Sequence, residues 1–146
     1  METKWKSLIF GMVLGIALLG SLFFNIFAHE AGHWTAAEIF SMEPKIHIFE
    51  AYGGGSFSLF TPNFFTTYNP VGTVGQDILV AFAGPLFNLL ITIGLIATYF
   101  AIPKEHRTFK ITLLFVVLTI PALVSFIANL MPFPSTDGSM IFSYLR

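Results

Sequence analysis

Residues 7–33 read SLIFGMVLGIALLGSLFFNIFAHEAGH, and this stretch decides the fold that the sequence predicts. Its first 22 residues carry no formal charge, which is enough for a helix to cross the hydrocarbon core of a bilayer. The pattern His29-Glu30-x-x-His33 follows directly. Positions four apart share one face of a helix, so the two imidazoles can bind one metal ion. Glu30 lies about 100° further round, where it can reach a water at the metal without being a ligand.

The composition is that of a membrane protein. Hydrophobic residues make up 55% and charged residues only 10% of the 146, whereas soluble domains have about 25% charged residues. The net charge of −1 gives no basic patch, so we exclude nucleic-acid binding. The chain has no cysteine, so a metal must be held by histidine and carboxylate. The length predicts a single unit over residues 1–146.

Two further uncharged runs, residues 78–102 and 111–136, are also long enough to span a bilayer. The sequence therefore predicts an all-α polytopic protein with three transmembrane helices, integral to the plasma (cell) membrane. The spans are expected over about residues 7–41, 76–102 and 111–146, with a proline break near 132–137.

The connection over residues 43–75 is too polar and interrupted to span, yet too apolar for an ordinary loop. Short apolar stretches at 46–49 and 56–60 flank three glycines at 53–55. This pattern predicts a membrane-associated β-hairpin after the first helix. A solvent-exposed loop stays open as the alternative.

Three unusual segments should meet at one level of the membrane. The first span ends at His29, the second begins just before residues 84–88, and the third arrives at residues 129–138 from the opposite side. A catalytic zinc takes three protein ligands and keeps one position open. Asp137 is the best third ligand, because it follows two prolines, and broken backbone at membrane depth is tolerated where it lines a cavity or is buried. The alternative is a surface turn at Asp137-Gly138.

These segments resemble the site-2 protease family of intramembrane zinc metalloproteases. The residues that carry the resemblance are His29-Glu30-Ala31-Gly32-His33, Gly84-Pro85-Leu86-Phe87-Asn88 and Asn129-x-x-Pro132-x-Pro134-x-x-Asp137-Gly138. The match covers about residues 8–138. It departs from the family pattern at Thr136 and Ser139, where a leucine and a second glycine are common.

The resemblance implies a three-helix catalytic core that hydrolyses peptide bonds within transmembrane segments of other membrane proteins. It implies one zinc ion on His29, His33 and Asp137, with Glu30 activating water. The substrate backbone would be held by Asn88, Asn129 and the hairpin glycines Gly54 and Gly55. Partners beyond the substrate and the lipid bilayer, such as a second copy or an accessory membrane protein, stay open.

Two other classes of function compete with a protease. A catalytically inactive adaptor could keep the fold, but it would not need the glutamate and all three ligand candidates. A metal transporter would need polar residues across the whole membrane, and the halves of the spans remote from His29 are almost purely apolar.

The sequence leaves the membrane orientation open. Positive charge predicts a cytoplasmic N-terminus, whereas the family usually has its zinc near the cytoplasmic face, which implies the reverse. Near the N-terminal side lie Lys4, Lys6, Lys104, Arg107 and Lys110, and on the other side Lys45 and Arg146.

Overall fold

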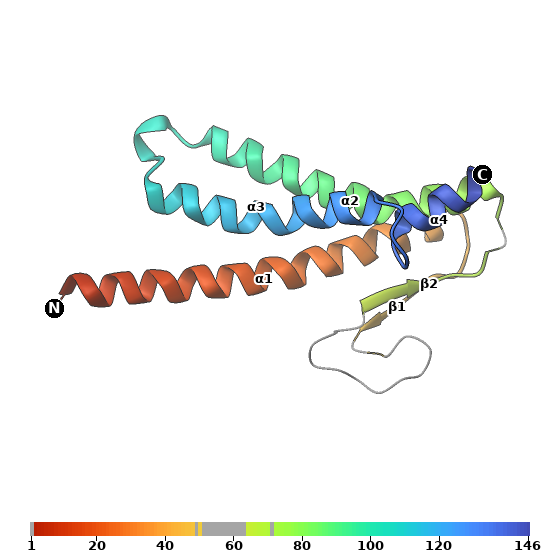
Figure 1. Cartoon of the computed structure of the whole chain (residues 1–146), viewed down its shortest axis with the longest axis horizontal. Helices are drawn as coiled ribbons and strands as arrows, with labels where there is room; N and C mark the ends of the chain where they lie inside the picture. The colour runs from red at the N-terminus through yellow and green to blue at the C-terminus, as the bar shows by residue number, and fades with distance from the viewer. Residues whose placement is uncertain (1, 49, 51–63, 71) are drawn as a thin grey trace.

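The structure, a computed structural model, describes the whole chain except residues 1, 49, 51–63 and 71. Three long helices dominate it (Figure 1): α1 over Glu2–Ile39, α2 over Val74–Ala101 and α3 over Phe109–Leu130. A short helix, α4, covers Asp137–Tyr144, and a small sheet is formed by β1 (Lys45–Ile48) and β2 (Phe64–Thr67). The predicted mostly helical fold with a hairpin after the first helix is confirmed.

Among the described residues, three helices, α1, α2 and α3, are long and apolar enough to cross a membrane. Their mean hydropathy over the most apolar window is 2.3, 2.2 and 2.6. Large apolar side chains such as Ile16 and Leu19 on α1 and Ile93 on α2 are exposed. Such a surface is unfavourable in water and suits the lipid interior. The three apolar helices therefore indicate a membrane protein.

The helices begin and end where the sequence supplies caps. Thr73 and Gln76 form a reciprocal capping box at the start of α2, and the Thr108 hydroxyl caps α3. Between them Lys104–His106 forms a 3-10 turn, η2, and the Arg107 guanidinium donates to the carbonyls of Phe100 and Ile102. This turn lies at the same end as the N-terminus, opposite α4 (Figure 1).

The third span is broken, as the prolines predict. Helix α3 ends at Leu130, and the chain resumes helical structure only at Asp137, with Thr136 as the N-cap of α4. Ser135 adopts the left-handed conformation, with φ at 68°. The break turns the chain so that α4 packs on α2 (Figure 1), which places Asp137 beside the first span.

The hairpin is antiparallel and differs in one strand from the prediction. Lys45 pairs with Thr67 and Ile48 with Phe64. The first strand matches the predicted one, and the second, β2, had not been predicted. The strand expected at 56–60 lies outside the described residues, as do Gly54 and Gly55.

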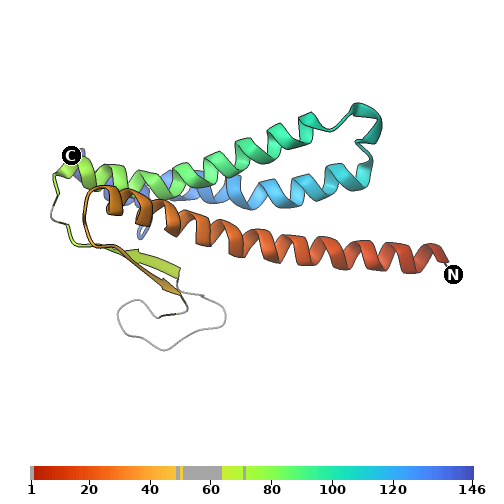
Figure 2. The same cartoon turned by 180° about the vertical axis from the view of Figure 1, so that it is seen from behind.

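The hairpin lies along α1, near the end of that helix that carries residues 29–33 (Figures 1 and 2). The Thr66 hydroxyl donates to the Glu30 carbonyl at 3.0 Å, and the Phe64 ring meets Phe23 edge-on. The sheet is thus attached directly to the helix that bears the histidines.

The core at this end joins α1, α2 and the hairpin. Ala37, Met42 and Val80 are buried together, with Tyr68 packed against them. A β-carbon on Gly32 would come within 2.5 Å of the Ala83 carbonyl oxygen, so only glycine lets α1 and α2 approach this closely. The close approach brings the end of α1 within hydrogen-bonding distance of the α2 backbone.

Candidate metal centre

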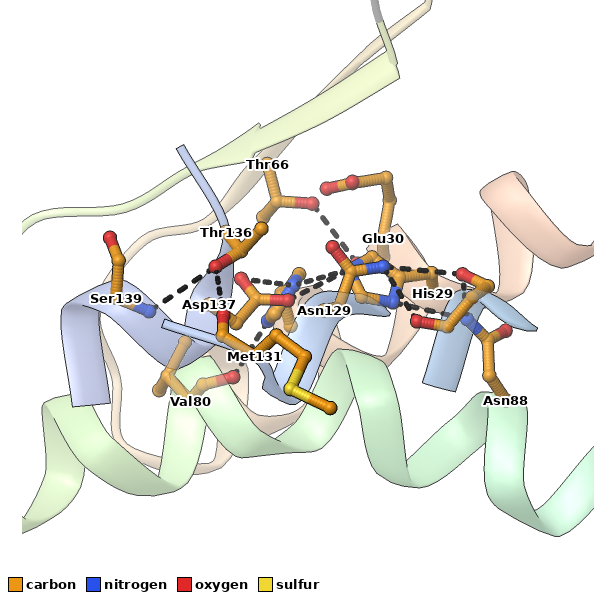
Figure 3. Close-up of polar contacts among 12 residues, drawn as sticks. His29, Glu30, Thr66, Val80, Asn88, Asn129, Met131, Thr136, Asp137 and Ser139 are labelled. Atoms are coloured by element: carbon orange, nitrogen blue, oxygen red, sulfur yellow. Dashed lines mark hydrogen bonds and ion pairs between the residues drawn. The ribbon is translucent and has the colours of Figure 1, made fainter. Parts of the chain in front are cut away.

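His29, His33 and Asp137 converge as the sequence predicts. Asp137 Oδ2 lies 3.0 Å from His29 Nε2, and Asp137 Oδ1 lies 3.3 Å from His33 Nε2. The two Nε2 atoms are 3.1 Å apart. All three candidate ligand atoms lie within 4.8 Å of one another, and Figure 3 shows the carboxylate facing His29. Within the described part of the chain, this is the group of three side chains suited to hold a metal ion.

Gly84 makes the room for this arrangement. A β-carbon at this position would collide with the His33 ring and come within 2.9 Å of the His29 ring. The glycine of the Gly84-Pro85 pair therefore faces both imidazoles. Because any side chain there would displace the rings, Gly84 allows α2 to lie directly against both imidazoles.

The ring of His33 is fixed by the backbone. Its Nδ1 lies 2.7 Å from the Val80 carbonyl oxygen and is buried. A carbonyl only accepts, so Nδ1 must carry the proton and Nε2 keeps its lone pair. A carbonyl behind the ring is the usual support of a metal-binding histidine.

Asn88 lies behind His29 and is fully buried, with 0% of its surface exposed. Its Nδ2 is 3.2 Å from His29 Nδ1 and donates to Ser125 Oγ at 2.7 Å. The resemblance implied that Asn88 holds substrate, but it is not among the residues that line the cavity. Its position is that of a residue that orients His29.

The carboxylate of Asp137 suits a cation. Its two oxygens lie 3.0 Å from His29 Nε2 and 3.3 Å from His33 Nε2. Oδ2 is buried and has no hydrogen bond within the described structure, although His29 Nε2 lies 3.0 Å away. A buried carboxylate oxygen without a donor, beside two imidazole nitrogens, fits a shared divalent ion.

A cavity of about 630 Å³ opens beside the three ligands. Figure 3 shows Glu30 extending from α1 toward Thr66 on β2, on the cavity side. Asn129, predicted to hold substrate, also borders the cavity, and its amide donates to the Ser125 carbonyl at 3.0 Å. The remaining lining residues are Phe64, Phe65, Thr66, Tyr68, Ala81, Ser135 and Met140.

Tyr68 presents a phenol to the same cavity. Burial, together with the charge of Asp77, raises its pKa to about 12. The hydroxyl therefore stays protonated across the physiological range. The hydroxyl donates only a weak hydrogen bond, to the Met140 sulfur at 3.9 Å. The phenol can therefore donate a hydrogen bond to a ligand in the cavity.

Two other histidines lie outside the site, as predicted. His47 on β1 stacks on Phe65 and binds the Glu50 carboxylate at 2.5 Å and the Thr67 hydroxyl at 2.9 Å. His106 belongs to the turn at the opposite end of the helices (Figure 1). Gly54 and Gly55, the proposed receivers of substrate, fall outside the described residues.

Several residues of the site were not singled out from the sequence, and Tyr68 is one of them. Val80 acts through its backbone carbonyl, which no residue type reveals. Thr66 lies on the unpredicted strand. Ser125 could have been noticed, because it stands one helical turn before Asn129 on an apolar span, and polar residues within spans by default mark function.

Comparison with protein-family models, with curated proteins and with solved structures found no match for this chain. The function of the chain is therefore inferred from the geometry of the site.

Proposed function

We propose that the chain is an intramembrane metalloendopeptidase of the site-2 protease type. One observation supports this most directly: His29 and His33 of the HExxH segment contact Asp137, which lies more than 100 residues later in the sequence, beyond the end of α3. Two nitrogens and one carboxylate oxygen are a donor set typical of catalytic zinc. When bound, zinc would lower the pKa of a water and polarise a carbonyl.

The histidines and the aspartate would hold the ion, with His33 oriented by the Val80 carbonyl. The ligands leave one side open to the cavity, as a catalytic rather than a structural site requires. The three ligands offer two imidazole nitrogens and a carboxylate oxygen. This donor set suits zinc, and other divalent transition metals can bind to the same ligands.

Glu30 would act as the general acid and base. It lies beside the ligands and faces the cavity without belonging to the ligand group. Its carboxylate would take the proton of the attacking water and return it to the leaving amine. The Tyr68 phenol and the Asn129 amide border the same cavity and would donate hydrogen bonds to the substrate backbone.

The substrate would be a transmembrane segment of another membrane protein. Peptide bonds in a helix are shielded by their own hydrogen bonds, so the segment must unwind before hydrolysis. Strand β2 borders the cavity through Phe64, Phe65 and Thr66, and an unwound segment could lie alongside it as an added strand. The three apolar spans would anchor the enzyme as a multi-pass protein of the plasma membrane.

Zinc content and proteolysis, measured together in detergent, test this proposal. We expect near-stoichiometric zinc in the wild type and in Glu30→Gln, and loss of zinc in His33→Ala and Asp137→Ala. Cleavage of a model transmembrane substrate should occur only with the wild type. Thr98→Val is a suitable control, because Thr98 bonds to the Gly94 carbonyl on its own helix.

The outcomes separate the parts of the proposal. Zinc retained by Asp137→Ala would remove the third ligand. Zinc bound by the wild type without any cleavage would favour the inactive adaptor, and a wild type that binds no zinc would overturn the metal centre itself.

A further inference from the structure

Helix α1 carries a row of buried polar side chains that extends from the metal ligands toward the N-terminus of the helix. Ser21, Asn25, His29 and His33 follow one another at intervals of four, so they share one face of the helix. All four are buried, and Asn25 is only 3% exposed. Polar side chains inside a membrane-spanning helix are costly and by default indicate function. The histidines have a role in the proposed site, whereas Asn25 has none so far.

The amide of Asn25 is held in one orientation. Its Nδ2 donates to the Ser21 carbonyl at 2.7 Å and lies 3.1 Å from the Ser21 hydroxyl, which itself donates to the Leu118 carbonyl on α3. Its Oδ1 is buried and has no hydrogen-bond partner among the described residues. Because two acceptors fix the nitrogen, the oxygen needs a donor.

The amide of Asn88 also has a buried oxygen without a donor among the described residues. A metal on His29 Nε2 requires the proton on Nδ1, so Nδ1 becomes a donor. Asn88 Nδ2 faces it at 3.2 Å, which would set two donors against each other. Asn88 Oδ1 meanwhile is buried without a partner in the described structure. Turning the amide by half a rotation, which leaves its shape almost unchanged, lets Oδ1 accept from both His29 and Ser125.

The turned amide needs an acceptor for its NH₂ group, and Asn25 stands one turn along α1 from His29, the residue that Asn88 contacts. Helices α1 and α2 run antiparallel (Figure 1). Asn25 is one turn before His29, and Ile91 is three residues after Asn88. Asn25 and Ile91 line the same cavity of about 350 Å³. Asn88 contacts His29, and Asn25 precedes His29 by one helical turn, an offset of roughly 5 Å along α1 that one water could bridge.

We propose that Asn25 is a positioning residue for the metal ligand His29. A buried water accepts from the turned Asn88 amide and donates to Asn25 Oδ1. This contact holds the Asn88 oxygen against His29 Nδ1–H, which fixes the ring with Nε2 toward the metal. Buried waters occupy polar gaps of this kind, where they satisfy groups that have no other partner. The inference rests on the proposed metal centre and extends it by a second layer of support.

A double-mutant cycle on zinc affinity tests the proposal, with Zn²⁺ alone as the probe and a chromogenic chelator as competitor in detergent. Asn25→Leu removes the oxygen at similar volume and should weaken zinc binding by about 10-fold or more. Asn88→Asp offers an oxygen to His29 whichever way its carboxylate turns. In that background Asn25→Leu should therefore change zinc affinity by less than about 2-fold, because the coupling is lost.

Tyr99→Phe is the matched control. It removes the hydrogen bond between the Tyr99 phenol on α2 and the Thr112 hydroxyl on α3 and touches neither Asn25 nor Asn88, so it should lower the thermal midpoint of the metal-free protein while zinc affinity stays unchanged. If Asn25→Leu does not fold, Asn25→Ala replaces it in both backgrounds, with folding checked by circular dichroism.

The results separate this inference from the proposed function. An equal loss of affinity from Asn25→Leu in both backgrounds would assign Asn25 to packing and overturn the inference. An unchanged affinity in an otherwise zinc-binding protein would overturn it too, and would leave the metal centre standing. A wild type without zinc affinity would overturn both.

Discussion

The two ends of the helical bundle are built on different principles. At the end that carries His29 and Asp137, buried polar side chains contact one another and a glycine brings α1 against α2. At the opposite end, a β-carbon on Gly11 or Gly15 would meet no described atom within 4 Å. Contacts there are aromatic and cationic, as where the Lys110 ammonium lies over the Phe10 ring at 5.2 Å. Close packing is therefore concentrated where a metal would have to be held.

The largest difference between the ends should appear with glycine substitutions on α2. Gly84→Ala would place a methyl group into the His33 ring, so we expect zinc affinity to fall by about 100-fold or more. Gly94→Ala is the matched control on the same helix, because a β-carbon there would meet no described atom within 4 Å. Competition with a chelator measures both. Equal affinities of the two variants would show that Gly84 does not shape the site.

Glycine substitutions on α1 should likewise differ between the two ends, in their effect on the stability of the protein. A methyl group on Gly32 would push against the Ala83 backbone, which cannot move without separating the helices. We expect Gly32→Ala to cost about 1–3 kcal/mol and to lower the thermal midpoint in detergent. Gly15→Ala should leave the midpoint unchanged or raise it slightly, since alanine is the better helix former. A midpoint for Gly32→Ala equal to that of Gly15→Ala would contradict the close approach of α1 and α2.

The comparison of the ends also explains what could be predicted from the sequence. His29 and His33 followed from helical periodicity, because local geometry fixes the face that they share. Asp137 followed from the proline break, although it is the packing of α4 on α2 that brings it beside α1. The partners behind the ligands depend on how helices pack. The Val80 carbonyl meets His33 only because α1 and α2 approach closely, and backbone atoms leave no trace in residue type.

The hairpin illustrates the same limit. The first strand was predicted at residues 46–49, and β1 covers Lys45–Ile48, which alternates in polarity. The second strand, Phe64–Thr67, reads FFTT and has no such alternation. Its strand structure comes from pairing with β1 and from the bond of Thr66 to α1. Both are contacts over long sequence distances, which a local pattern does not contain.

A smaller effect is expected where the hairpin meets the site. Thr66→Val keeps the shape of the side chain and removes its hydrogen bond to the Glu30 carbonyl, worth about 1 kcal/mol. If β2 receives the substrate, KM for a model transmembrane substrate should rise by about 5-fold, the equivalent of that free energy. Zinc content should not change. Thr67→Val, on the exposed neighbour that contacts His47, is the control, and a rise in KM equal for both variants would argue against a specific role of Thr66.

The smallest effect on the site should come from the opposite end. Arg107 donates to two carbonyls where α2 ends and lies over the rings of Tyr99 and Phe100. Arg107→Ala should lower the free energy of unfolding by about 1–2 kcal/mol, because those carbonyls lose their donors. Zinc affinity and cleavage per bound zinc should stay at wild-type values, since the site is one full span away. If zinc affinity instead fell together with stability, the two ends would form one cooperative unit, and the separation between a tightly packed site and a loosely packed anchor would have to be abandoned.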